Sequence, residues 1–260
     1  YHGRTRKVKN DDTKRMDKNM QADLSKKDEQ FREFSLNGPM WRVVLYVGFP
    51  LALYESLNQL FKILDTMMAA HISANAVSTV AYLSQINMAI SALGGGLAVG
   101  ASIKISEAYG EGNFELVKRR VSTLFALCGL LGMAILAILI PVAPQFLRLA
   151  NTPEEFIEEG TVYFILELVS LVIIFFNNVY IAIERARGNS KRILNLNMMV
   201  IGIKLSLTAF FVYVLKGGIN YISIATIVSQ LTLFGAAVFY MNAKENVFGF
   251  SWKAISFRNW

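Results

Sequence analysis

Residues 121–140 read VSTLFALCGLLGMAILAILI and carry no charged side chain, and Pro141 follows them directly. A helix that crosses the hydrocarbon core of a membrane needs ~20 mostly apolar residues. Lipid cannot satisfy free backbone N–H and C=O groups, so an isolated apolar segment of this length must cross the membrane as a helix. This stretch therefore predicts a transmembrane helix and decides the fold class of the chain.

Five other stretches have a similar length and apolar character. We therefore expect an all-α fold, a polytopic membrane bundle of six transmembrane helices. The ten-residue alternation of membrane barrel strands does not occur in these stretches. The six predicted spans cover residues 41–68, 78–106, 121–140, 161–183, 193–215 and 219–241.

The overall composition agrees with a membrane protein. Of the 260 residues, 54% are hydrophobic and 17% are charged, and the mean hydropathy is +0.40. Soluble domains carry ~25% charged residues, so this chain is depleted in charge. The net charge of +7 does not indicate a nucleic-acid partner, because the basic residues flank apolar spans instead of forming one folded patch. Membrane lipids are the expected partner.

The residue sets of enzymes and metal proteins are missing from the sequence. The single cysteine, Cys128, lies in an apolar run, which excludes a disulfide framework and indicates a buried thiol. The two histidines, His2 and His71, have no ligand-type neighbours at metal-binding spacing. No nucleophile pairs with a histidine, and no phosphate-cradling loop occurs. We expect no enzyme, no cofactor and no metal site.

The distribution of Lys and Arg predicts the orientation, because cytoplasmic loops are enriched in these residues. Counted by predicted loop, 22 of the 26 basic residues fall on one side of the membrane. Only Arg148 and Lys216 fall on the other side, and Lys62 and Lys204 lie within spans. Both ends of this segment are therefore expected in the cytoplasm, which agrees with an even number of spans. We expect the cell membrane of a bacterium as the location.

The spans divide the chain into three parts. Residues 1–37 are expected to be a basic cytoplasmic tail, disordered to about residue 27. Residues 31–37 fit either a short interfacial helix or more of this tail. Residues 38–243 form the six-helix lobe, and residues 244–260 a cytoplasmic linker. The chain does not start with Met and shows no signal peptide, so we expect a segment of a longer protein.

Two local patterns predict further details. Asn151-Thr152-Pro153-Glu154-Glu155 combines a cap residue, a first-turn proline and early carboxylates, which indicates a helix on the outer surface that runs into the fourth span. The small-residue run of Gly94, Gly95 and Gly96 with Gly100 indicates close helix packing.

The first span carries a row of polar side chains, which are costly in a membrane and often functional. At 100° per residue they fall in one sector of the helix, so this face must meet protein or water. Pro50 precedes them and frees a backbone carbonyl, so we expect a kink there. The row forms either a structural seam between helices or part of a pathway for a solute or ion. Its members are Glu55, Asn58, Gln59, Lys62 and Asp65.

Later spans carry further polar side chains at a similar depth. With a rise of ~1.5 Å per residue, Asp65, Glu167, Thr208 and Thr226 each lie ~10 Å below their outer helix ends. Lys204 lies ~16 Å deep, and its long stem can bring the ammonium group outward to the same level. These depths permit one polar cluster in the outer half of the bundle.

The sequence resembles the N-terminal half of multidrug and toxic compound extrusion (MATE) transporters, over residues 38–241. Four segments in family order carry this resemblance. The first segment is Gly38-Pro39-Met40-Trp41, followed by Pro50 and Leu64-Asp65-Thr66. The second segment is Gly96-Leu97-Ala98-Val99-Gly100-Ala101-Ser102, followed by Glu107-Ala108-Tyr109-Gly110-Glu111-Gly112. The third segment is Tyr163 with Ile183-Glu184-Arg185-Ala186-Arg187-Gly188-Asn189-Ser190-Lys191, and the fourth runs from Gly217-Gly218-Ile219 through Ala225-Thr226 to Gln230.

The resemblance implies a function. Such transporters have twelve helices in two six-helix lobes, and they expel cationic or amphipathic drugs and metabolites in exchange for Na⁺ or H⁺. This chain would supply one lobe, and its partner would be the second lobe of the same protein. Two alternatives stay open: a flippase for a lipid-linked or amphipathic substrate in the same superfamily, and a non-transporting membrane subunit.

The resemblance also implies a cation site, from which this chain departs. One branch of the family uses an aspartate of the first helix, an asparagine and an aspartate of the fifth, and a threonine of the sixth. Asp65 and Thr226 match the first and last, but Lys204 and Thr208 stand at the fifth-helix positions. We hypothesise that Lys204 pairs with Asp65, with Glu167 close by, and that its ammonium replaces the cation. Protonation of the carboxylate would then loosen the pair; a purely structural pair is the alternative.

Overall fold

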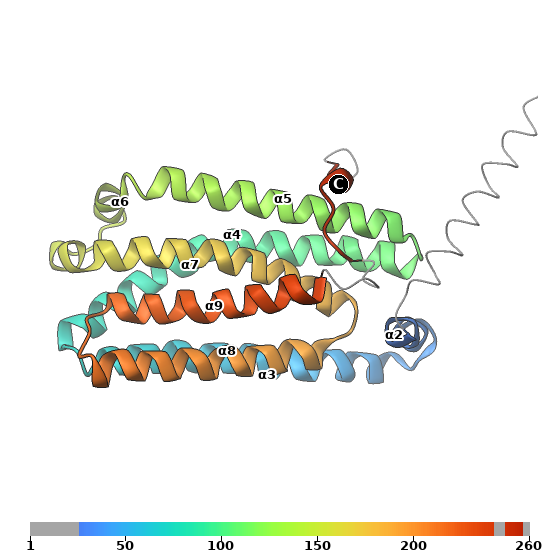
Figure 1. Cartoon of the computed structure of the whole chain (residues 1–260), viewed down its shortest axis with the longest axis horizontal. Coiled ribbons are helices and arrows are strands. Elements are labelled where there is room, and N and C mark those ends of the chain that lie inside the picture. The colour runs from blue at the N-terminus through green and yellow to red at the C-terminus, as the bar shows by residue number, and fades with distance from the viewer. Residues whose placement is uncertain (1–25, 242–247, 257–260) are drawn as a thin grey trace, which may run out of the picture.

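The computed structural model describes residues 26–241 and 248–256, and within these ranges the regular elements are all helical (Figure 1). The helices are α2 (Lys26–Asn37), α3 (Met40–Ala69), α4 (Ala74–Gly110), α5 (Phe114–Leu139), α6 (Ala143–Leu149), α7 (Glu154–Ala186), α8 (Ser190–Ala209), a π-helical turn η1 (Phe210–Val214), α9 (Asn220–Met241) and a short 3₁₀ turn η2 (Trp252–Ala254).

Each of the six predicted spans matches one helical segment, with α8 and η1 counted together; three spans reach one residue past the helix end, and most of the helices start earlier than the predicted span. The Ser73 hydroxyl caps α4 by accepting a hydrogen bond from the Ala76 amide at 2.9 Å, which starts this helix ahead of the predicted span. α7 begins at Glu154, directly after Pro153, as the sequence signal on the outer loop predicted. The short helix α6 before it was not predicted.

Among the described residues, five helices are long and apolar enough to cross a membrane: α4, α5, α7 from residue 160, α8 with η1, and α9. α3 does not meet the same criterion although it has 30 residues, because its polar row lowers its hydropathy. It nevertheless packs along α8 and against α4, so it completes a lobe of six long helices (Figure 1).

α7 is the central helix of the lobe. It packs against α4, α5 and α9, with smaller contacts to α6 and α8. Its buried residues recur every three or four positions, as an apolar stripe of a helix requires: Phe164, Leu168, Leu171, Phe175 and Val179. α3 and α8 lie outside this core and reach it through α4 and α9.

Only part of the glycine run on α4 is used for packing inside the lobe. Gly94 is buried, and a Cβ atom there would collide with the ring of Phe175 on α7. At Gly95, Gly96 and Gly100 nothing lies within 4 Å of a Cβ placed there, so their close packing is not seen among the described helices and stays a prediction. Their backbone therefore faces away from the described helices of this lobe.

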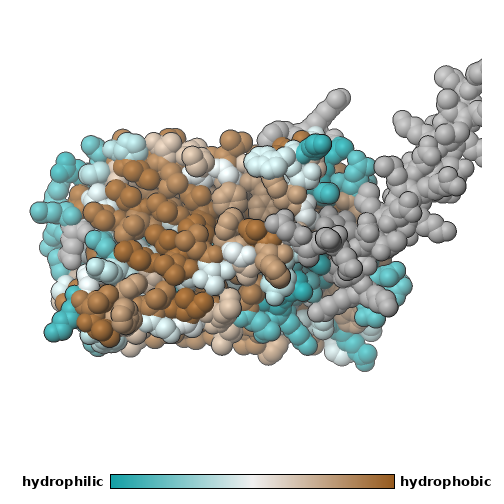
Figure 2. Space-filling model, viewed as in Figure 1, coloured by the Kyte–Doolittle hydropathy of each residue, from teal (hydrophilic) through white to brown (hydrophobic). Residues whose placement is uncertain are grey.

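Both ends of the described chain lie at the same end of the bundle. Figure 1 shows α2 and η2 there, and α6 at the opposite end. Figure 2 shows hydrophobic surface over the middle of the visible face and hydrophilic residues at both ends, as a membrane-spanning protein requires. An even number of spans explains why the two ends meet. The cytoplasmic assignment of this end stays a prediction.

Of the two expectations for residues 31–37, the structure contains the helix, which starts earlier at Lys26. Figure 1 shows α2 end-on, so it lies across the end of the bundle. The Arg32 guanidinium donates a hydrogen bond to the Gly110 carbonyl at 3.1 Å, and the Phe31 ring lies against Gly188. The predicted disorder before this helix falls on residues 1–25, which lie outside the described part of the chain.

The corner between α7 and α8 is built around a buried carboxylate. Glu184 is 1% exposed and forms ion pairs of 3.2 Å with both Arg187 and Arg192. Gly188 completes the turn with a φ of +72°, a conformation that a side chain disfavours. The Arg187 guanidinium also lies over the ring of Phe248, which is fully buried. This corner fixes the segment after residue 247 to the end of the lobe.

Candidate functional site

Polar side chains from five helices meet in the half of the lobe where α3 and α8 end and α9 begins. Asp65 lies four residues before the end of α3, ~6 Å, which is shallower than the predicted ~10 Å. Lys204 lies five residues before the end of α8, which continues directly into η1. The central helix α7 contributes Glu167, which interacts electrostatically with both of these groups. We call these side chains and their hydrogen-bonding neighbours on α4 and α9 the polar cluster.

Lys204 and Asp65 form a direct ion pair. Nζ of Lys204 donates a hydrogen bond to Oδ2 of Asp65, and the two side chains are only 15% and 16% exposed. The hypothesised contact between these residues is thus present in the structure. Charges in a membrane protein interior are tolerated when they are paired, because pairing offsets much of the cost of removing them from water. The other carboxylate oxygen of Asp65, Oδ1, is buried and has no hydrogen-bond partner among the described residues.

Glu167 is bound by neutral groups. Asn87 Nδ2 of α4 donates to one carboxylate oxygen at 2.9 Å, and Ser223 Oγ of α9 donates to the other at 2.8 Å. Tyr163, one turn before Glu167 on the same helix, is 3% exposed and interacts with Ser84 and Ser223. The carboxylate of Glu167 therefore lies among hydroxyl and amide groups, with the charges of Asp65 and Lys204 nearby.

The two threonines of the predicted site behave differently. Thr208 is fully buried on α8, one turn after Lys204, and its Oγ1 has no partner among the described residues. Thr226 is 8% exposed, but its Oγ1 donates to the carbonyl of Ile222 in its own helix at 3.1 Å. No contact of Thr226 with Asp65 or Lys204 is seen in the described structure, so its expected role stays a prediction.

The polar row of α3 splits into two parts. Asn58 faces α8, where its Oδ1 accepts a hydrogen bond from Asn197 Nδ2 at 3.2 Å, and Asp65 faces the same helix. Glu55 and Gln59 are exposed on the lobe. The Lys62 side chain lies outside the described structure.

Pro50 is buried, and α3 continues through it without interruption. The predicted kink at this position stays a prediction.

Sequence reasoning missed Asn87 and Ser223, which hold Glu167. Both are neutral polar residues in apolar stretches, and such residues are common in transmembrane helices. Only their depth in the predicted spans could have indicated them. Ser223 precedes Thr226 by less than one turn, and Asn87 lies well inside the second predicted span. Without the helix arrangement, nothing in the sequence distinguished them from other serines and asparagines.

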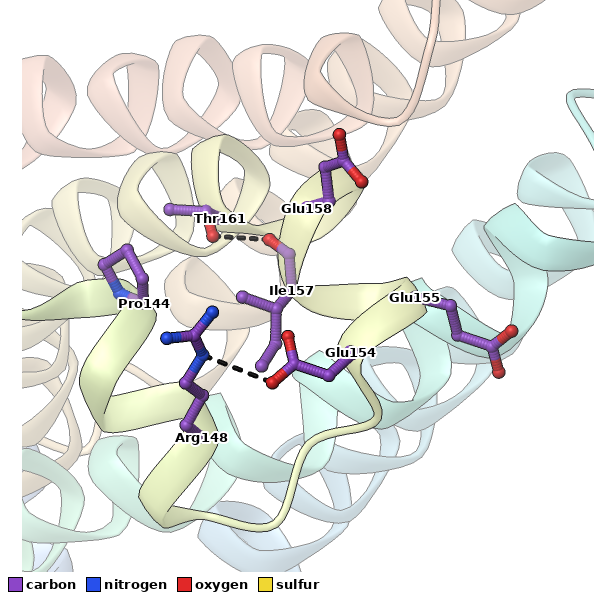
Figure 3. A pocket seen from close by; sticks show the side chains of 7 residues that line it. All are labelled: Pro144, Arg148, Glu154, Glu155, Ile157, Glu158 and Thr161. Carbon is purple, nitrogen blue, oxygen red and sulfur yellow. Dashed lines mark hydrogen bonds and ion pairs between the residues drawn. The ribbon is translucent and has the colours of Figure 1, made fainter.

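A separate hollow of about 530 Å³ lies at the opposite end from α2, between α6 and the first turns of α7 (Figure 3). Arg148 Nε forms an ion pair with Glu154 at 3.3 Å across it, while Glu155 and Glu158 point outward. The hollow contains no residue of the polar cluster. Its lining residues are Pro144, Arg148, Glu154, Glu155, Ile157, Glu158 and Thr161.

Within the described residues, no group of three His, Cys, Asp or Glu side chains is placed to hold a metal ion. A membrane lobe with a partly buried ion pair and a further carboxylate between its helices is typical of secondary transporters, whose ion and substrate sites lie within the membrane between helices.

The family follows from the comparison of sequences. The family model named MatE matches residues 50–210, so this chain belongs to the MatE family. Its members are membrane transporters and not enzymes. No curated protein sequence matches the chain.

Solved structures share the fold. A structure described as the outward-facing conformation of a multidrug resistance MATE family transporter of the MOP superfamily matches with a TM-score of 0.80, 22% identity, and coverage of 90% of this chain and 51% of that one. A MATE in the bent conformation matches with a TM-score of 0.78, 22% identity, and coverage of 91% and 51%.

A MOP superfamily transporter from Pyrococcus furiosus, described as having a reverse polarity of its binding pocket, matches with a TM-score of 0.76, 21% identity, and coverage of 90% and 51%. This chain thus spans about half the length of the transporters it matches.

Proposed function

We propose that this chain is one lobe of a cation-coupled antiporter, which exports cationic or amphipathic drugs or metabolites across the cell membrane. The second lobe would come from sequence outside this chain, and the transported solute would pass between the two lobes by alternating access. The supporting evidence is the family membership and the placement of ionisable groups inside the lobe.

The observation that carries this proposal is the exposure of Glu55 and Gln59. Glu55 lies near the middle of the 30-residue α3, where an ionised side chain in contact with lipid costs at least about 2.5–3.5 kcal/mol. No described helix of this lobe covers either side chain. They must therefore face water or another protein surface, as the wall of a central cavity between two lobes does. A carboxylate on that wall attracts cationic solutes.

The polar cluster supports the coupling part of the proposal. It lies at the far end of α3 from Pro50 and connects α3 to α8 through the pair of Asp65 and Lys204. A change of protonation or ion occupancy in this cluster changes the attraction between these two helices. Because α3 also carries Glu55, such a change reaches the face that would meet the solute.

The experiment uses the full-length protein, including the second lobe, purified and reconstituted in lipid vesicles. Cationic dyes are supplied, and accumulation is measured under an imposed proton gradient and, separately, under a sodium gradient. We expect accumulation under at least one gradient and a loss of dye transport for Glu55→Gln. The exposed Glu115→Gln on the other face of the lobe is the matched control. Absence of dye transport by the wild-type protein under both gradients and in dye exchange would contradict the proposal; lipid scrambling in the same vesicles would indicate a flippase.

A further inference from the structure

The polar cluster contains an unequal number of charges. Two carboxylates, Asp65 and Glu167, interact with one ammonium, that of Lys204. Among the described side chains, Tyr163 is a further titratable group that interacts with both carboxylates, and its phenol is neutral. The described residues of α4, α5, α6 and α9 bring no charged side chain to Glu167. With both carboxylates ionised the cluster carries one net negative charge, which is costly in an interior of low dielectric. One further positive charge balances the cluster.

The contacts show which carboxylate can take this charge as a proton. Asp65 already has Lys204 in direct contact, so a proton on Asp65 would break an ion pair and leave the ammonium unpaired. Among the described residues, Glu167 forms hydrogen bonds with Asn87 and Ser223, and both are neutral. Protonation of Glu167 removes a charge without leaving another one unpaired.

The partners of Glu167 also suit both protonation states. A serine hydroxyl donates to a carboxylate and, after rotation, accepts from a carboxylic acid. An asparagine amide does the same when its side chain turns over, since it carries both a donor and an acceptor. Oδ1 of Asn87 is buried and has no partner among the described residues, so the amide can turn without losing a hydrogen bond at that atom. The ammonium of Lys204, by contrast, can only donate.

We propose that Glu167 takes up and releases the coupling proton of this lobe, while Lys204 keeps its ion pair with Asp65. When Glu167 is protonated, Lys204 binds Asp65 alone and fastens α3 to α8. When Glu167 loses its proton, its carboxylate attracts Lys204 as well, and the contact between α3 and α8 weakens. The proton goes to a carboxylate oxygen of Glu167 and returns to water, so no other reactant is needed. This inference rests on the proposed transport function for its coupling role.

The transport test compares four forms of the full-length protein in vesicles: wild type, Glu167→Gln, Asp65→Asn and the exposed control Glu115→Gln. Each is measured for dye accumulation under a proton gradient and for dye exchange without a gradient over a range of pH. Glu167→Gln keeps the shape of the side chain and can bond to both neighbours. We expect it to lose proton-driven accumulation and the pH dependence of exchange, while exchange itself continues. Glu115→Gln should behave as the wild type.

Three results would overturn the inference while leaving the proposed function intact. The first is proton-driven accumulation that persists in Glu167→Gln with an unchanged pH profile. The second is accumulation by the wild type under a sodium gradient but not under a proton gradient. The third is a pH dependence of exchange that is lost in the double variant Asp65→Asn with Lys204→Met, measured in the same way, in which Glu167 keeps no charged partner among the described residues.

A second measurement does not depend on transport. Infrared difference spectra of the purified protein, recorded as the pH is changed, show the carbonyl band of a carboxylic acid that gains or loses its proton. We expect a band that is present in the wild type and missing in Glu167→Gln. In Asp65→Asn the freed ammonium of Lys204 balances Glu167, so the band should weaken there and return in the double variant Asp65→Asn with Lys204→Met. A band that disappears in Asp65→Asn and persists in Glu167→Gln would assign the proton to Asp65 and contradict the inference, whether or not dye is transported. Thermal unfolding shows that each variant is folded.

Discussion

Replacement of Lys204 with Met tests the contribution of the ion pair directly. Met keeps most of the length of the side chain but removes the ammonium, so the carboxylate of Asp65 loses the hydrogen-bond partner that it has among the described residues. Removal of one member of a buried pair costs about 3–5 kcal/mol. The two side chains retain exposures of 15% and 16%, so we expect the lower end, about 3 kcal/mol. In a chain of this size that corresponds to a decrease in Tm of about 6–12 °C.

The assay is a double-mutant cycle on the purified protein in detergent, followed by fluorescence during thermal unfolding. The variants are Lys204→Met, Asp65→Asn and the two combined. The combined variant leaves no unpaired charge at this contact, so its loss of stability should be smaller than the sum of the single losses by at least about 2 kcal/mol. The control cycle removes the exposed pair of Arg119 and Glu115, whose side chains are 37% and 67% exposed, and should give a coupling below about 0.5 kcal/mol.

Additive losses for Lys204 and Asp65, within about 0.5 kcal/mol of the sum, would refute the reasoning, because they would mean that the two groups do not interact in the folded protein. An unchanged Tm of Lys204→Met would refute it as well. In that case Asp65 would be solvated well enough to carry its charge alone.

Three further outcomes are expected. Replacement of Glu184 with Gln should lower stability by about 3 kcal/mol, because two arginines lose a buried counter-charge; an unchanged thermal unfolding curve would contradict this. Gly94→Leu should lower stability by at least about 1–3 kcal/mol, because the new side chain collides with the Phe175 ring. Gly95→Leu is the control and should leave stability unchanged. Equal losses for the two variants would show that the contact of Gly94 with Phe175 is not the cause. Cysteines introduced at Glu111 and Leu149, which are both exposed, should react with a membrane-impermeant maleimide from opposite sides of the membrane. The cysteine at Glu111 should react only from the cytoplasm. Labelling of both cysteines from one side would disprove the orientation.

The spans were predictable because burial in lipid requires a long apolar run, and such a run of consecutive residues can be recognised directly in the sequence. The contact of Asp65 and Lys204 could also be predicted, since two opposite charges at matching depth have few other partners. The surroundings of Glu167 could not. Neutral side chains such as Asn87 and Ser223 can bond to their own helix or to water, so their partners depend on helix rotation, which the sequence pattern does not determine.

The same dependence on helix rotation applies to Thr226 and to the glycine run of α4. A threonine hydroxyl in a helix bonds readily to the carbonyl four residues earlier, and Thr226 does so in place of joining the polar cluster. The glycine spacing on α4 predicts a flat helix face, but it does not specify which neighbour approaches that face. Only Gly94 meets a helix of this lobe, because the other glycines lie on a different side of α4.

The low hydropathy of α3 has a consequence for biosynthesis. Glu55 lies near the middle of α3, where a charged side chain costs about 2.5–3.5 kcal/mol during insertion by the translocon, so this helix enters lipid poorly when it is alone. The residues that satisfy Asn58 and Asp65 follow 139 positions later, on α8. At about 5–20 residues per second, the ribosome needs on the order of 10 s to make that stretch. For this period α3 must stay near the translocon or a chaperone, and its stable insertion must wait for α8.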